Sequence, residues 1–235
     1  MKNIALILAA GSGSRCGSKY PKQFIMIDNK TLLEYTIDSF ENHKAIDEIY
    51  LTIPHEYTDK VNNLIVQAGY KKVVRVIEGG KTRRDSSYLG ISAINENDAN
   101  ILVHDGARPF VSGEIITSCI NALSVHDAVC TAIDSTDTIF ITDDNGIIQD
   151  IPAREYVLRA QTPQCFKLKL IRKAHELAKH DKNAFVTDDC GLVKLYNLTD
   201  MYTVKGDLNN IKITYPCDLD FAKGLIYKSG DFSIS

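Results

Sequence analysis

The sequence lacks several features that mark common classes of protein. It has no Cys-x-x-Cys pair and no cysteine–histidine spacing typical of a metal site, so its six cysteines are expected to be free thiols of a reducing compartment. Its apolar runs are too short for a membrane span or for the hydrophobic part of a secretion signal. The Walker phosphate-binding sequence is missing too. These absences favour a cytoplasmic protein without a membrane anchor.

A strong excess of charge is also missing. With a net charge of −3, the chain is not expected to have the broad basic face with which proteins bind nucleic acid. Its 44% hydrophobic and 24% charged residues are the balance of an ordinary soluble globular protein. We expect one α/β domain spanning residues 1–235, in which local clusters of cations meet any anionic ligand.

What the sequence does have is a glycine-rich loop directly after its first strand. The apolar run 4–10 has the continuity of a buried parallel strand, and Gly11 and Gly13 follow it. Glycine lets the backbone turn sharply and leaves peptide N–H groups unmasked, so that they can face an anion. Arg15 and Lys22 add two cations to the same loop. This combination favours a polyphosphate ligand over a neutral one.

The spacing Gly11-x-Gly13 leaves a second interpretation open, an NAD(P)-dependent oxidoreductase. Against it, Cys16 stands at the third glycine of the dinucleotide-binding fingerprint, and the second strand ends at 52–54 in Thr-Ile-Pro, without the expected acidic residue. A non-catalytic nucleotide sensor is another rival, which a measurement of turnover would separate. We rank a transferase ahead of both.

Short apolar strands alternate with helical segments along most of the chain, which predicts a mainly parallel sheet flanked by helices. Helix 31–40 should begin with Thr31 as its N-cap and Glu34 completing a capping box, and helix 187–195 with Thr187 as its cap. The other expected strands are 48–54, 72–77, 100–109, 128–133, 201–205 and 210–214, and the other expected helices are 56–68, 88–94, 115–123, 168–179 and 216–227.

Two more polar turns follow strands of this sheet. Segment 78–87 carries two glycines, three cations and several hydroxyl groups, and segment 104–109 carries an acid, a glycine and an arginine. Ligands of open α/β sheets bind at the carboxyl edge of the strands. The three turns are therefore expected to converge on one ligand.

The alternation of strand and helix is interrupted after residue 136. Two apolar segments, 137–142 and 147–152, flank Asn145-Gly146, which is a strong hairpin signal. A lone two-stranded ribbon is marginal in water, so we expect this hairpin to be buried against a second subunit.

Together these motifs resemble the family of polyol-phosphate cytidylyltransferases, the methylerythritol phosphate and ribitol phosphate enzymes. The resemblance covers nearly the whole chain, from Leu8-Ala-Ala-Gly with Arg15 and Pro21-Lys-Gln, through Gly79-Gly with Arg83 and Ser86 and His104-Asp-Gly-Ala-Arg-Pro, to Thr162-Pro-Gln and Asn210-Ile-Lys-Ile-Thr. It implies a single Rossmann-like nucleotidyltransferase domain that uses CTP, a polyol phosphate and Mg²⁺. It also implies a homodimer in which residues 138–158 form a dimerisation arm.

The resemblance assigns three groups of residues. Arg15 would bind the leaving pyrophosphate, Lys22 the α-phosphate, and Lys212 would be the third catalytic cation. CTP would contact Ala9, Ala10, Gly11, Ser12, Gly13, Gly79, Gly80, Arg83, Ser86, Asp105, Gly106, Ala107 and Arg108, with Asp105 also a candidate metal ligand. The polyol phosphate would contact Thr138, Arg154 and Thr162, the first two reaching across from the partner subunit.

The residues alone leave simpler interpretations open for some of these positions. Asp105 could cap a helix, Arg83 could be a solvated surface charge, and Arg154 could form a salt bridge at the hairpin base. His104 is interpreted as a packed residue rather than a catalytic base.

Two departures from the family pattern bear on the acceptor. Phe140 stands where methylerythritol enzymes commonly carry lysine, which favours a pentitol phosphate such as ribitol 5-phosphate. Asn209 replaces an aspartate often found before Asn-Ile-Lys, which weakens the case for a metal ligand there. The segment His104-Asp-Gly-Ala-Arg-Pro instead resembles the methylerythritol enzymes. We rank 2-C-methyl-D-erythritol 4-phosphate, an isoprenoid precursor, first and ribitol 5-phosphate, a precursor of cell-surface polymers, second.

Overall fold

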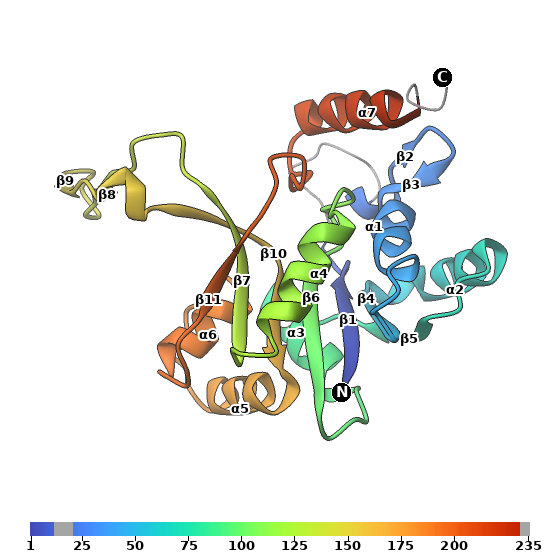
Figure 1. Ribbon diagram of the computed structural model, residues 1–235, viewed down its shortest axis with the longest axis horizontal. Helices are drawn as coiled ribbons and strands as arrows, with labels where there is room; N and C mark the ends of the chain where they lie inside the picture. The colour runs from blue at the N-terminus through green and yellow to red at the C-terminus, as the bar shows by residue number, and fades with distance from the viewer. Residues whose placement is uncertain (12–20, 231–235) are drawn as a thin grey trace.

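A seven-stranded sheet forms the centre of the molecule (Figure 1), and the computed structural model describes residues 1–11 and 21–230. The strand order is β11-β7-β10-β6-β1-β4-β5, and β10 alone of these seven runs antiparallel to its neighbours. The expectation of a mainly parallel α/β sheet is therefore confirmed. The strands are β1 Lys2–Leu8, β4 Glu48–Ile53, β5 Val73–Glu78, β6 Ala99–Asp105, β7 Ala128–Asp134, β10 Leu158–Lys167 and β11 Tyr202–Lys205.

The central strand β1 is buried on both faces, which explains its continuous apolar sequence. Ala5 and Ile7 join one hydrophobic cluster, and Ile4 and Leu6 join the other. The first cluster lies under α1 Leu32–Glu41, α2 Thr58–Ala68 and α4 Gly113–Ala122. The second lies under α3 Arg83–Ser92, α5 Leu168–Lys179 and α6 Asp189–Leu195.

Helix starts follow local hydrogen bonding. The capping box of α1 forms as predicted, because Thr31 accepts from the backbone of Glu34 and Glu34 accepts from the backbone of Thr31. The predicted cap of α6 was wrong by one residue: Asp188 Oδ1, not Thr187, accepts from Gly191 N at 2.8 Å.

Strand β10 is the main feature that the sequence did not predict. Segment 160–166 was expected to continue from the hairpin, yet it forms a strand inside the sheet, between β6 and β7. Its pairing changes register between Ala160 and Gln164, and the peptide bond Thr162–Pro163 in that interval is cis. This position brings Thr162 and Gln164 beside the carboxyl end of β6.

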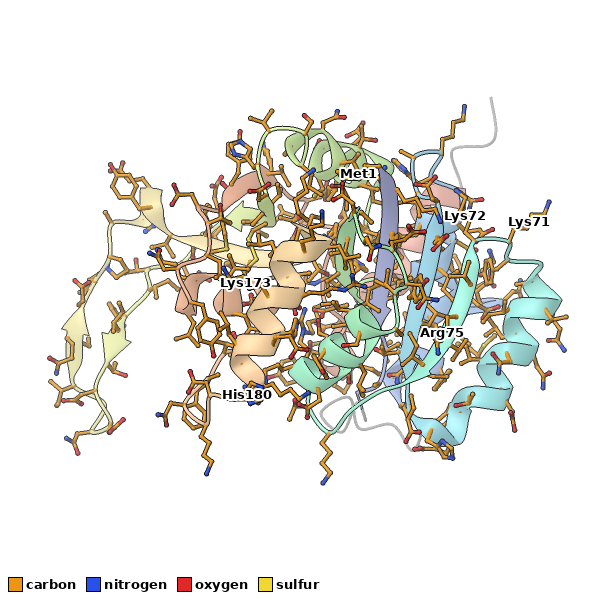
Figure 2. The ribbon with its side chains drawn as sticks, turned by 90° about the horizontal axis from the view of Figure 1, so that it is seen from below. Met1, Lys71, Lys72, Arg75, Lys173 and His180 are labelled. Carbon is orange, nitrogen blue, oxygen red and sulfur yellow. A yellow bond between two sulfur atoms is a disulfide. The ribbon has the colours of Figure 1, made fainter. Side chains whose placement is uncertain are left out.

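The hairpin extends away from the sheet at one end of the molecule in both views (Figures 1 and 2). Strands β8 Ile141–Thr142 and β9 Ile148–Asp150 pair antiparallel, and Gly146 adopts a φ of +82° at the turn. The short 3-10 helix η4, Arg154–Tyr156, follows before the chain returns into β10. We refer to residues 138–158 as the arm.

The C-terminal part of the chain gives one confirmation and one correction. Helix α7, Pro216–Gly230, forms where a helix was predicted, and it packs on the hairpin of β2 Met26–Ile27 and β3 Lys30–Thr31. The short helix η2, Lys22–Phe24, precedes that hairpin. Segment 210–214 is not a strand. It runs beside Ala107, whose carbonyl accepts from Ile213 N at 2.9 Å.

The prediction that the cysteines are free thiols was wrong for one pair. Cys130 on β7 and Cys190 on α6, 60 residues apart in the sequence, form a disulfide. Cys119, Cys165 and Cys217 are free. Within residues 1–11 and 21–230, no helix is both long and apolar enough to cross a membrane.

Candidate active site

Three loops meet at the carboxyl edge of the sheet, as the sequence predicted. Short backbone hydrogen bonds join them: Ala9 N to Thr52 O, Gly79 N to Ile53 O and Gly106 N to Leu8 O, each 2.8 Å. Ala9, Gly79 and Gly106, at the starts of the turns after β1, β5 and β6, are therefore held to one another through the ends of β1 and β4.

Two of the predicted glycines are required by this close approach. A Cβ on Gly79 would lie 2.1 Å from Ala10 Cβ, and one on Gly106 would lie 2.8 Å from Ala9 Cβ. At both positions a side chain would push the first loop out of place. Gly11 has nothing within 4 Å of such a Cβ, so packing against the described residues does not explain that glycine.

Lys22 reaches this edge from η2. Its Nζ donates to Ile213 O at 2.6 Å, which ties the first loop to the segment that carries Lys212. The neighbouring Gln23 is buried and donates to Ala9 O at 2.5 Å and to Gly11 O at 3.0 Å. Gln23 was not predicted as a site residue, although its side chain binds two carbonyl groups of the first loop.

A cluster of charges surrounds Asp105 at the end of β6. Its Oδ1 accepts from Arg83 Nε at 3.2 Å, and its Oδ2 lies 2.8 Å from Lys212 Nζ and 3.6 Å from Arg108 Nε. Burial alone would raise the pKa of the Asp105 carboxyl, but Arg83, Lys212 and Arg108 outweigh it and hold that pKa well below its usual range. Asp105 is thus an anion that positions three cations, and it does not cap a helix. Arg83 is paired with a buried carboxylate and is not a solvated surface charge.

Two adjoining cavities share this cluster. One, of about 230 Å³, is lined by Lys22, Lys212, Arg83, Ser86 and the backbone of loops 8–11 and 105–107. The other, of about 200 Å³, is lined by Thr162, Gln164 and Asp188. Arg83, Asp105 and Lys212 line both cavities, so they lie at the junction between them.

Two more of the residues predicted to contact CTP, Ser86 and Arg108, form hydrogen bonds within the protein. Ser86 Oγ accepts from Gly80 N at 3.1 Å and donates to Thr82 O at 3.0 Å, so it shapes the second glycine turn. Arg108 is buried and donates to Asn210 O at 2.8 Å. The predictions for Ser12, Gly13 and Arg15 lie outside the described residues.

The three predicted acceptor residues do not lie together within one chain. Thr162 is buried in β10, where its Oγ1 accepts from Asp105 N at 3.0 Å and donates to His104 Nδ1 at 2.9 Å. Thr138 and Arg154 are exposed on the arm, where Arg154 Nη2 donates to Thr138 Oγ1 at 3.3 Å. This bond replaces the salt bridge that the sequence left open for Arg154.

His104 is a packed residue, as predicted. It is fully buried, its Nε2 donates to Arg108 O at 3.0 Å, and its Nδ1 accepts from Thr162. Burial lowers the pKa of His104 to about 4. The imidazole is therefore neutral at pH 7, and both of its nitrogens serve to position the end of β6.

A metal ion held by the protein alone needs several oxygen, nitrogen or sulfur ligands from its side chains. In the described part of the chain, no three His, Cys, Asp or Glu residues gather to hold a metal. Asp105 lines the first cavity, but both of its oxygens face cations. These residues do not fit a metal site built by the protein alone, and a metal-binding role for Asp105 stays a prediction.

Fold and site together define the class: an α/β nucleotidyltransferase with glycine turns and a cluster of cations at the carboxyl edge of its sheet. The sequence matches the family 2-C-methyl-D-erythritol 4-phosphate cytidylyltransferase over residues 3–228. The chain belongs to that family.

Individual relatives agree with this assignment. Proteins named 2-C-methyl-D-erythritol 4-phosphate cytidylyltransferase from Clostridium perfringens (strain ATCC 13124) and Clostridium botulinum (strain Loch Maree) are 40% and 39% identical. The alignments cover 96% and 97% of this chain and 99% and 98% of those proteins. The crystal structure of 4-diphosphocytidyl-2C-methyl-D-erythritol synthase from Anaerococcus prevotii DSM 20548 superimposes with a TM-score of 0.86, at 36% identity and 96% coverage of both chains.

Family membership confirms the prediction of a CTP-dependent cytidylyltransferase and favours the methylerythritol acceptor over ribitol phosphate. The oxidoreductase interpretation based on Gly11-x-Gly13 is thereby rejected.

Proposed function

We propose that this protein transfers the cytidylyl group of CTP to 2-C-methyl-D-erythritol 4-phosphate. The observation that carries the proposal is the convergence of Lys22, Lys212 and the Asp105–Arg83 pair on one cavity lined by the glycine turns. A phosphate oxygen of the acceptor attacks the α-phosphorus of CTP, the bond to the bridging oxygen breaks, and pyrophosphate leaves. No covalent enzyme intermediate is required.

In this reaction the protein contributes position and charge. Lys22 and Lys212 supply positive charge to phosphate oxygens whose negative charge increases toward the transition state. Lys212 is 39% exposed, so its ammonium remains accessible while Asp105 holds it from below. Arg15 adds a cation on the pyrophosphate side. The backbone groups of loops 9–11 and 79–80, with Ser86, are assigned to the nucleotide, and Asp105 to Ala107 to the ribose.

Mg²⁺ is inferred to be carried by the phosphates of CTP. This inference is consistent with the mismatch between the described carboxylates and a metal site. A cytoplasmic location fits the consumption of CTP and the three free cysteines, although the Cys130–Cys190 disulfide would be a dithiol in a reducing compartment.

The acceptor site is proposed to form between two copies of the chain. Thr162 and the second cavity belong to one subunit, and Thr138 and Arg154 would come from the partner's arm. The guanidinium of arginine suits this task because its planar fork can donate two parallel bonds to a phosphate. The exposed apolar side chains of the arm support a homodimer, because they would be covered by a second chain.

Pyrophosphate release measured in parallel with CTP and each polyol phosphate tests the proposal. We expect methylerythritol phosphate to be preferred strongly, because a site built to bond particular hydroxyl groups rejects an analogue that lacks them. Faster release with ribitol 5-phosphate would overturn the acceptor but leave the reaction class intact. Release with neither acceptor would overturn the function.

A further inference from the structure

A buried carboxylate that lines neither cavity binds Arg83, a residue of both. Asp189, the first residue of α6, is fully buried, and its Oδ2 accepts from Arg83 Nη1 at 2.7 Å. Its Oδ1 accepts from Ser87 Oγ at 2.6 Å and from His175 Nε2 at 3.0 Å. Helices α3, α5 and α6 therefore meet on one charged group.

Asp189 and Asp105 hold the same guanidinium. Arg83 donates through Nη1 to Asp189 and through Nε to Asp105, which are different edges of one rigid plane. Fixing two edges of a planar group sets its orientation. Arg83 lines both cavities, so this orientation determines the charge at the junction where CTP and the acceptor would meet.

The two carboxylates also differ in what else they bind. Asp105 pairs with Lys212 at 2.8 Å, whereas the other partners of Asp189 are a serine and a histidine within the helical layer. Without the charge of Asp189, Arg83 would be balanced by Asp105 alone, and the bond between Asp105 and Lys212 would weaken. Burial alone would raise the pKa of Asp189, but Arg83 and His175 lower it to about 2, so the carboxyl is ionised at neutral pH.

We propose that Asp189, held by Ser87 and His175, is a positioning residue for the transfer reaction. It acts through Arg83, which it holds against Asp105 so that Lys212 keeps its place in the CTP cavity. This inference rests on the proposed function for its effect on turnover. Its effect on CTP binding can be measured independently.

A double-mutant cycle tests the proposal. Asp189→Asn, Arg83→Gln and the double variant are compared for kcat/KM in pyrophosphate release and for the dissociation constant of CTP. We expect D189N to lower kcat/KM about 30-fold and R83Q about 100-fold, with the double variant no worse than R83Q, because the first residue acts only through the second. The double variant should also melt higher than R83Q, because R83Q alone leaves the buried Asp189 carboxylate without its guanidinium partner.

Matched variants separate positioning from folding. Glu176→Gln neutralises an exposed carboxylate next to His175 on α5 and should leave kcat/KM within about twofold of native. Should D189N not fold, Ser87→Ala keeps both charges and should lower kcat/KM about threefold, an effect that disappears in the R83Q background.

Losses that multiply in the double variant would overturn the proposal, because Asp189 would then act independently of Arg83. Native kcat/KM and native CTP affinity in D189N would overturn it too. Absence of pyrophosphate release by the unmodified protein would instead contradict the proposed function, and the CTP-affinity cycle would still decide the role of Asp189.

Discussion

The carboxyl edge of the sheet and the arm differ in how far their residues are buried and held by contacts within one chain. At the edge, Asp105 is only 7% exposed, and hydrogen bonds within one chain hold Ala9, Gly79 and Gly106 at the described starts of the three turns. On the arm, Phe140 is 55%, Ile147 61% and Tyr156 82% exposed, and the hairpin strands β8 and β9 pair with each other only. The nucleotide end of the proposed site therefore lies within a single chain. The acceptor end, as proposed, needs a second one.

This difference matches what recognition of the two proposed substrates requires. A triphosphate is recognised by charges and backbone N–H groups, which a compact sheet edge can supply by itself. The acceptor must be distinguished from similar polyol phosphates by side chains that contact its hydroxyl groups. The arm carries candidates for that task on a segment with few internal constraints.

Removing a cation from the edge should have the largest effect. Lys22→Ala and Lys212→Ala are each expected to lower kcat by about 10²- to 10³-fold, because the lost charge stabilises the transition state more than the bound substrates. Lys71→Ala is a control, since Lys71 is exposed and precedes the amino end of β5, away from the carboxyl edge. Steady-state kinetics with CTP measure the effect, and near-native turnover in either variant would refute the assignment.

Mixing two inactive chains should show whether the arm serves its own site or that of its partner. Lys22→Ala disables the edge and Arg154→Ala the arm. If the arm crosses over, equal mixing of the refolded variants gives mixed dimers with one intact site, and about a quarter of native activity should return. If each arm serves its own chain, both sites of the mixed dimer are defective. No recovery in verified mixed dimers, or a monomer by light scattering, would reject the crossing arm.

A methyl group at a closely packed glycine of the edge should cost stability, whereas one at an open glycine should not. Gly79→Ala places a Cβ 2.1 Å from Ala10 Cβ, and we expect a loss of about 1–3 kcal/mol in unfolding free energy together with weaker CTP binding. Gly224→Ala on α7, with nothing within 4 Å of the added Cβ, is the control. Equal urea midpoints for the two variants would mean that the glycine turn adapts.

The edge should also be the acid-sensitive region. Because burial lowers the pKa of His104 to about 4, the unfolded chain binds more protons than the folded chain between about pH 6.5 and pH 4, and stability falls as the pH falls through that window. At pH 5 the loss is about 2 kcal/mol. Urea unfolding at pH 7.5 and pH 5 should show this loss in the native protein and a smaller one in H104Q, in which His43, whose pKa is also lowered by burial, remains.

The exposed His180 provides the control, because H180N should retain the native pH dependence (Figure 2). A pH dependence in H104Q that matches that of the native protein would show that another group causes the acid sensitivity.

Much of the site was predictable because it depends on short segments. The run 4–10 indicated β1, and the polar residues after β1, β5 and β6 indicated one binding edge, since parallel strands present their carboxyl ends together. The sequence reasoning missed Gln23, which supports the first loop, and Asp189, which holds Arg83 from 106 positions away. Neither residue lies in a pattern that distinguishes it from an ordinary polar residue of a turn or helix start.

By itself the sequence determined most of the strands and helices and the faces that they bury, because the spacing of apolar residues and the caps act over a few positions, as Thr31 and Glu34 show. Only the tertiary structure decided that β10 enters the centre of the sheet, that 210–214 follows Ala107 as an irregular segment, and that Cys130 meets Cys190. These outcomes depend on the pairing of distant segments. Their free energy comes from sheet hydrogen bonds, burial and ion pairs that exist only once the chain has closed, so no local spacing records them.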